Sequence, residues 1–146
     1  MTSWPPVPEI RPDARPGTRV LVIYGMARTK KNRPIMTRAG YNQTGRAVLL
    51  PNKEWVAWAK DAPLKYAGEW PTRPMTQQVN CAASFYLTPR QGGDALGYYE
   101  GLADLLQDRG VLLNDKLIVQ WDRSRLLVDA AHPRVEVELE PVPLTL

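Results

Sequence analysis

The sequence predicts an α+β protein in which a small mixed sheet carries two main helices on one face. Two stretches, 76–88 and 134–140, alternate apolar and polar residues, a pattern typical of strands with one buried face. Two others, 52–66 and 94–108, repeat apolar residues at helical spacing. With 44% hydrophobic and 23% charged residues in a chain of 146, the composition fits one globular domain.

The first third of the chain is expected to hold one strand between two irregular segments. Residues 1–17 contain five prolines and one glycine, so we expect an extended or disordered leader ahead of a single domain over 18–146. The run 18–25 is apolar and β-branched and ends at a glycine, which predicts a buried strand. Residues 26–50 include Pro34 and lack helical periodicity, which predicts a long loop or a loose hairpin.

The middle of the chain predicts a helix followed by a long strand. Asn52 is a suitable N-cap for the helix over 52–66, and Pro63 should end or kink it. Its tryptophans could stack on bases, although core packing is the simpler interpretation. In the strand over 76–88, Cys81 falls on the apolar face and is interpreted as a small core residue.

The last part of the chain predicts a helix and two strands. The helix over 94–108 has Asp94 as a natural N-cap and Gly110 as a natural stop. Strands are expected over 115–122 and 134–140, close enough in sequence to form a hairpin across the intervening turn region.

Composition excludes several classes of protein. No apolar run approaches the 18 residues of a membrane span, and the N-terminus lacks the apolar core of a signal peptide. Cys81 is the only cysteine, so no intrachain disulfide forms, and a reducing, cytoplasmic location is expected. One cysteine and one histidine, His132, cannot build a typical Cys/His zinc site.

The net charge of +4 is concentrated in one segment. Residues 28–46 contain six basic and no acidic side chains. Such a segment either faces a polyanion such as nucleic acid or is simply a solvated loop. The basic residues are Arg28, Lys30, Lys31, Arg33, Arg38 and Arg46.

Two carboxylates are candidates for a metal site. Asp94 at a helix start and Asp115 at a strand start are most simply a cap and a turn residue. If the strand pairs so that its start lies beside the helix start, the two carboxylates meet and provide the oxygen ligands that Mg²⁺ needs. Glu100, Asp104 and Asp108 are spaced by four and share one helix face, either solvated or turned inward as further ligands or a general base.

The segments together resemble the RusA-like Holliday junction resolvases, small phage and prophage crossover junction endodeoxyribonucleases, over most of residues 18–140. A strand ends in glycine and runs into a Lys/Arg-Pro motif, here YGMARTKKNRP (24–34). A proline-led helix with tryptophan follows, here LPNKEWVAWAKDA (50–62). GLADLL (101–106) resembles the apolar-Asp-x-Leu turn of the family, and GVLLNDKLIV (110–119) resembles its Gly-x-x-x-Asp-Asp segment.

The resemblance is incomplete at the acidic motif. The family has Asp-x-Asp-Asn at the helix start and a lysine one turn later. Asp94 and Asp115 match family positions, but the second Asp, the Asn and the Lys are replaced by Leu96, Gly97 and Glu100. Glu100 is interpreted as a replacement for the lost carboxylate.

The resemblance implies a homodimer that cuts four-way junctions with Mg²⁺. Asp94 and Asp115, with Glu100 or Asp104, would hold the ion, and Lys30 or Lys31 would neutralise charge in the transition state. The side chains implied to hold DNA phosphates are Arg28, Lys30, Lys31, Arg33 and Arg38.

Two alternatives remain open, and the missing Asp and Lys favour the first of them. The first is a junction- or DNA-binding protein with a degenerate active site that no longer cuts. The second is a small protein-interaction domain in which the basic segment is coincidental.

Overall fold

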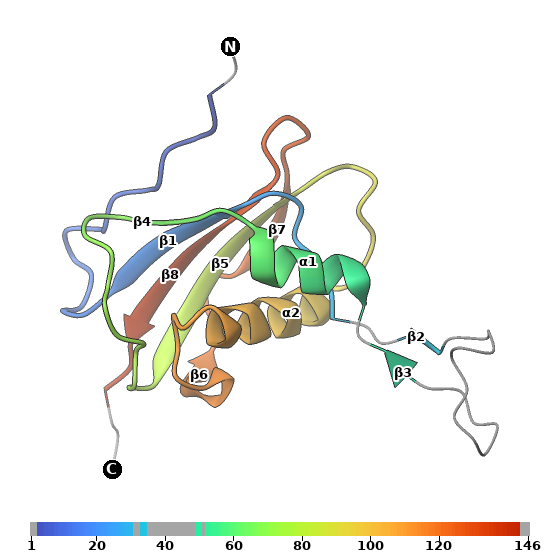
Figure 1. The fold of residues 1–146 in the computed structure, drawn as a ribbon. Helices are drawn as coiled ribbons and strands as arrows, with labels where there is room; N and C mark the ends of the chain where they lie inside the picture. The colour runs from blue at the N-terminus through green and yellow to red at the C-terminus, as the bar shows by residue number, and fades with distance from the viewer. Residues whose placement is uncertain (1–2, 31–32, 35–48, 51, 144–146) are drawn as a thin grey trace.

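A computed structural model describes residues 3–30, 33–34, 49–50 and 52–143, with backbone alone for 33–34 and 49–50. The core is a six-stranded sheet with both main helices against one face (Figure 1). This confirms the predicted small mixed sheet with two helices. The elements are β1 Arg19–Tyr24, β2 Arg33–Pro34, β3 Leu49–Leu50, α1 Lys53–Asp61, β4 Leu64–Tyr66, β5 Val79–Leu87, α2 Ala95–Asp108, η2 Asp115–Leu117, β6 Ile118–Gln120, β7 Arg125–Val128 and β8 Arg134–Pro141.

The two alternating strands form the centre of the sheet. Strand order is β4-β1-β8-β5-β6, with β7 also paired to β5. On β8, Val135, Val137 and Leu139 are buried beneath the helices, whereas the intervening glutamates face the other side. The predicted inward residues of β5 are likewise all buried: Val79, Cys81, Ala83, Phe85 and Leu87.

The predicted terminal hairpin is wrong. Strand β8 lies between β1 and β5 and is antiparallel to both, while β6 pairs in parallel with the other edge of β5. The chain from β5 through α2 to β6 is therefore a crossover connection, and such a connection joins parallel strands. The expected strand over 115–122 is also shorter, because its first residues form η2, and the expected turn region contains β7.

Helix α1 is shorter than predicted. Asn52 caps it as expected, accepting the N–H of Glu54 at 2.9 Å. The helix ends at Asp61, ahead of Pro63, and the residues that follow form β4 beside β1. Its two tryptophans, Trp55 and Trp58, are buried in the core, as the simpler interpretation held.

The leader contains no helix or strand over its described residues, 3–17. It is nevertheless attached to the domain. Arg11 binds Glu138 and Glu140, and the Tyr24 hydroxyl donates to the carbonyl of Pro5 at 2.9 Å. Because those glutamates point away from the helices, the leader lies on the opposite face of the sheet. Within the described residues, no helix has the length and apolar character needed to cross a membrane.

Candidate nucleic-acid interface

The start of the basic segment crosses α2 over two glycines. A Cβ on Gly97 would lie 3.2 Å from Thr29 Cγ2, and a Cβ on Gly101 would lie 2.5 Å from the Arg28 carbonyl oxygen. Only glycine allows backbone to pass so close to a helix. One turn apart on the helix, Gly97 and Gly101 thus form a notch that holds residues 28–29 against α2.

Ion pairs at both ends of this crossing fix the basic side chains. Arg28 Nη1 lies 3.2 Å from Glu54 Oε2 of α1. Lys30 Nζ lies 3.1 Å from Asp104 Oδ2 of α2 and 4.6 Å from the ring centre of Trp55. Trp55 is itself anchored, because its Nε1–H donates to the Gly101 carbonyl at 3.0 Å. Both helices therefore position the first two cations of the segment.

A cavity of about 510 Å³ lies between α2 and the chain that follows it. We call it the α2–η2 cavity. Its charged lining residues are three carboxylates and one lysine. The rings of Tyr99 and Trp121 also line it and stack on each other, with centres 4.7 Å apart and planes inclined by 9°. Its lining comprises Leu96, Tyr99, Glu100, Ala103, Asp104, Asp115, Lys116, Ile118 and Trp121.

Asp94 and Asp115 lie at opposite ends of α2. The Asp94 Oδ1 caps the helix by accepting the N–H of Gly97 at 2.8 Å. The Asp115 N–H donates to Gln107 Oε1 at 2.8 Å, in the last turns of the helix. The stretch from 94 to 107 is roughly 20 Å long at about 1.5 Å per residue. The expectation that these two carboxylates meet is therefore not fulfilled within one chain.

The direction of β6 causes this separation. Because β6 is parallel to β5, its first residue, Ile118, pairs with Val79 at the start of β5. Helix α2 begins after β5 has ended, at the far end of that strand. The start of β6 therefore lies beside the end of α2. Glu100 in the middle of the helix and Asp104 further along it line the same cavity as Asp115, whereas Asp94 does not line it.

The α2–η2 cavity contains carboxylate oxygens of the kind that Mg²⁺ binds, but they do not form a metal-binding group. Across the described ranges, no three acidic, histidine or cysteine side chains are grouped closely enough to hold a metal by themselves. Mg²⁺ is, however, commonly bound by one or two carboxylates, with water and substrate phosphates completing its coordination. Glu100, Asp104 and Asp115 offer hard oxygen donors for such a site, but not a preformed cage.

Several predicted phosphate ligands cannot be placed. Lys31 and Arg38 lie outside the described residues, and only the backbone of Arg33 is described, paired with Leu50. Of the predicted basic set, Arg28 and Lys30 are the two whose side chains the structure describes.

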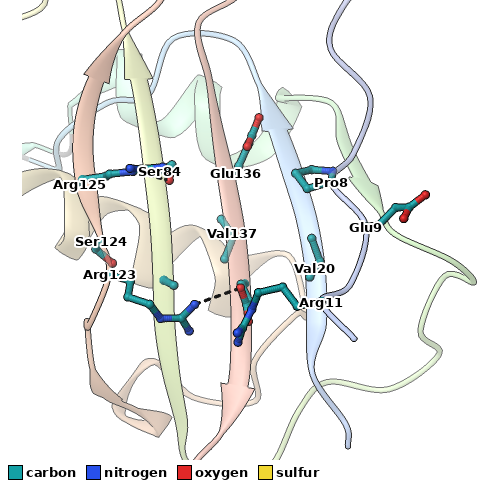
Figure 2. Close-up of a pocket in the computed structure, with 12 residues that line it drawn as sticks. Pro8, Glu9, Arg11, Val20, Ser84, Arg123, Ser124, Arg125, Glu136 and Val137 are labelled. Carbon is teal, nitrogen blue, oxygen red and sulfur yellow. Dashed lines mark hydrogen bonds and ion pairs between the residues drawn. The ribbon is translucent and has the colours of Figure 1, made fainter. Parts of the chain in front are cut away.

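A second cavity, of about 540 Å³, lies on the opposite face of the sheet, between the leader and β7 (Figure 2). Three of its charged residues, Arg11, Arg123 and Glu138, are paired with one another. Arg11 Nη2 lies 2.8 Å from Glu138 Oε1, and the hydrogen bond that Arg11 donates to this carboxylate raises the pKa of Arg11 above its usual value. Arg123 approaches Glu138 at 3.5 Å from the other side. This cavity is therefore interpreted as the attachment site of the leader.

Two features of the site were not predicted from the sequence: the glycine notch and the stacked pair of Tyr99 and Trp121. The spacing of Gly97 and Gly101 by four residues is the signal that identifies a close approach on a helix. Nothing local pairs Tyr99 with Trp121, which meet only because η2 folds back on α2. Cys81 is fully buried, and burial raises the pKa of its thiol, which agrees with a core role.

No protein-family model matches this chain, and a search of the curated proteins finds no match either.

Proposed function

We propose that this protein is a Mg²⁺-dependent endonuclease that acts on branched DNA at the α2–η2 cavity. The observation that carries the proposal is the convergence of Glu100, Asp104 and Asp115 on one open cavity, with Lys30 of the basic segment bound to Asp104. Metal-assisted phosphodiester hydrolysis uses carboxylates to hold the metal ion and a cationic side chain to bind the phosphate. The resemblance to RusA-like resolvases supports branched DNA as the substrate.

Each residue of the proposed site has its own role. Glu100 and Asp115 would hold the ion, with Asp104 beside them. Bound Mg²⁺ would supply an activated water and stabilise the leaving oxygen. Lys30, which is paired with Asp104, would donate to a phosphate oxygen and offset the charge that develops there. The exposed part of the Tyr99–Trp121 pair would offer a face on which a base can stack.

The proposed substrate has two-fold symmetry, so we also propose a homodimer. Cutting a four-way junction productively requires incisions in two opposing strands, and a dimer supplies one site for each. The mass of the particle in sedimentation at micromolar concentration tests this part. A single-chain mass with full junction cleavage would contradict paired incision by a dimer.

The cleavage test compares three amide substitutions on a synthetic four-way junction with Mg²⁺. We expect Glu100→Gln and Asp115→Asn each to lower the cleavage rate by about 100-fold or more while junction binding persists. Asp94→Asn is the matched control, since Asn caps helices as well as Asp and the chain loses the same charge. We expect it to cut at the wild-type rate.

The controls decide between assignments. Wild-type cleavage by both Glu100→Gln and Asp115→Asn would overturn the metal site. Loss of cleavage in Asp94→Asn, with a normal circular dichroism spectrum, would indicate that Asp94 of a second copy of the chain contributes to the site.

A second candidate is a junction-binding protein that does not cut. One observation favours it. Asp104 is paired with Lys30, so the negative charge of one of the three carboxylates is already balanced without a metal ion. Tight junction binding with no cleavage in Mg²⁺ or Mn²⁺ would select this alternative.

A further inference from the structure

A third cavity, of about 300 Å³, lies between the first turns of α1 and α2. We call it the arginine cavity. It is predominantly polar, and its charged residues are two arginines and one glutamate, so its net charge is positive. It is lined by Met26, Ala27, Arg28, Thr29, Asn52, Glu54, Thr88, Arg90, Gln91, Gly92 and Tyr98.

We propose that the arginine cavity binds a second phosphate of the DNA strand whose cleaved phosphate lies at the α2–η2 cavity. The inference rests on the proposed function. It extends that function by assigning Arg90 and Thr88, which lie outside the basic segment, to the backbone of the same strand, together with Thr29.

The walls of the cavity are held rigidly by hydrogen bonds. Gln91 Nε2 donates to the Ala27 carbonyl at 2.8 Å, and Gln91 Oε1 accepts the N–H of Thr88 at 2.8 Å. The Tyr98 hydroxyl donates to the Gly92 carbonyl at 2.6 Å. The turn after β5 is thereby fixed to the start of the basic segment. A site whose donors are fixed in advance loses less entropy when a phosphate binds.

The two arginines differ in their partners. Arg28 is paired with Glu54 at 3.2 Å, an exposed contact that contributes little by itself. Arg90 is exposed, and within the part of the chain that the structure describes it forms no ion pair. Guanidinium groups bind phosphate with two parallel hydrogen bonds, and Arg90 can form them without first breaking an ion pair among the described residues.

The position of the arginine cavity relative to the α2–η2 cavity suits one strand. Arg28 lines the first, and Lys30, two residues later, is bound to Asp104 of the second. Positions two residues apart lie at most about 7 Å from each other. The two cavities therefore lie next to each other along the same stretch of chain, as contacts to one DNA strand require.

Arg90→Ala tests the assignment. The control is Arg73→Ala, which removes the same charge from an exposed position on another loop. Both are measured by binding of a four-way junction without divalent ions across a salt series. We expect Arg90→Ala to weaken binding about tenfold and to reduce the slope of log K against log salt by about one. Arg73→Ala should change neither.

Glu54→Gln provides a test of opposite sign. Removing this carboxylate releases Arg28 and raises the positive charge of the cavity, so we expect binding to tighten by about two- to fivefold at low salt. Inorganic phosphate at millimolar concentration is the second probe. It should compete with the junction for the wild type more strongly than for Arg90→Ala.

The outcomes separate this inference from the proposed function. Equal affinity and salt slope for Arg90→Ala and the wild type would overturn the arginine cavity as a phosphate site, even with cleavage intact. Absence of junction binding by the wild type would overturn the proposed function and this inference together.

Discussion

The carbonyl oxygen of Arg28 lies 2.5 Å from the point that a Cβ on Gly101 would occupy. No real Cβ contact is that short, and the atom in the way is backbone, which cannot rotate aside. The first cation of the basic segment is therefore positioned by the missing side chain of a helix residue. The carbonyl of Gly101 also accepts the Trp55 Nε1–H, so this one residue of α2 contacts both the basic segment and α1.

Gly101→Ala should displace the basic segment. Because the added methyl group overlaps the Arg28 carbonyl, we expect a loss of about 1–3 kcal/mol in the free energy of unfolding, the usual cost of overpacking. Junction affinity should fall as well, since Arg28 and Lys30 move. Urea denaturation and binding measurements check both effects.

Gly92→Ala is the control for that change, because nothing lies within 4 Å of its added Cβ. It should leave the free energy of unfolding close to the wild-type value. Equal stability of Gly101→Ala and Gly92→Ala would show that the segment does not press on α2.

Trp55→Phe should cost more than Trp58→Phe. Both indoles are buried in α1, but Trp55 donates to the Gly101 carbonyl, whereas Trp58 Nε1 has no hydrogen-bond partner among the described residues. Removing a satisfied donor forfeits a hydrogen bond worth about 0.5–1.5 kcal/mol, while removing an unsatisfied one does not. Thermal or urea unfolding of the two variants measures the difference. The reverse ranking would contradict the assigned indole bonds.

Asp129→Asn should remove a pH-dependent part of the stability. Asp129 Oδ2 accepts from Arg134 Nη1 at 2.9 Å, and that bond, followed by the His132 N–H, holds the pKa of the carboxyl below its usual 3.8. A carboxyl with a lowered folded pKa contributes stability above its unfolded pKa. That contribution is lost as pH falls below 3.8 towards the folded pKa.

The free energy of unfolding from urea curves between pH 7 and pH 2 checks this sign. The deficit of Asp129→Asn should be largest at neutral pH and should shrink below pH 3.8. Glu69→Gln, at an exposed loop position, is the control and should follow the wild-type curve. A deficit that grows on acidification would refute the Arg134 pairing.

Arg11→Gln should loosen the leader without unfolding the domain. Arg11 bonds to Glu138 and Glu140 across the outer face of the sheet. Pairs of this kind are screened by salt and are each worth about 0–1 kcal/mol, so global stability should change little. Hydrogen exchange of residues 3–17 should speed up in the variant and, for the wild type, at high salt. Arg15→Gln, which bonds only to the carbonyl of Pro141 within the described residues, should have a smaller effect.

Local patterns predicted the pieces of this fold better than their arrangement. Alternation identified β5 and β8, and cap chemistry identified both helix starts, because burial of one face and satisfaction of free N–H groups are local requirements. The pairing of β6 with β5 was missed, since the three residues of β6 carry no signal of direction or partner. The candidate site depended on that pairing, which brings Asp115 to the end of α2 rather than to Asp94.

The sequence by itself determined the two central strands, the starts of both helices and the basic character of residues 28–46, since each follows from side-chain chemistry and spacing along the chain. Only the tertiary structure decided which acids share a cavity. It turned β6 parallel to β5, placed Asp115 with Glu100 and Asp104, and left Asp94 as a helix cap. Long-range neighbours depend on how the sheet closes around the core, which no stretch of sequence encodes alone.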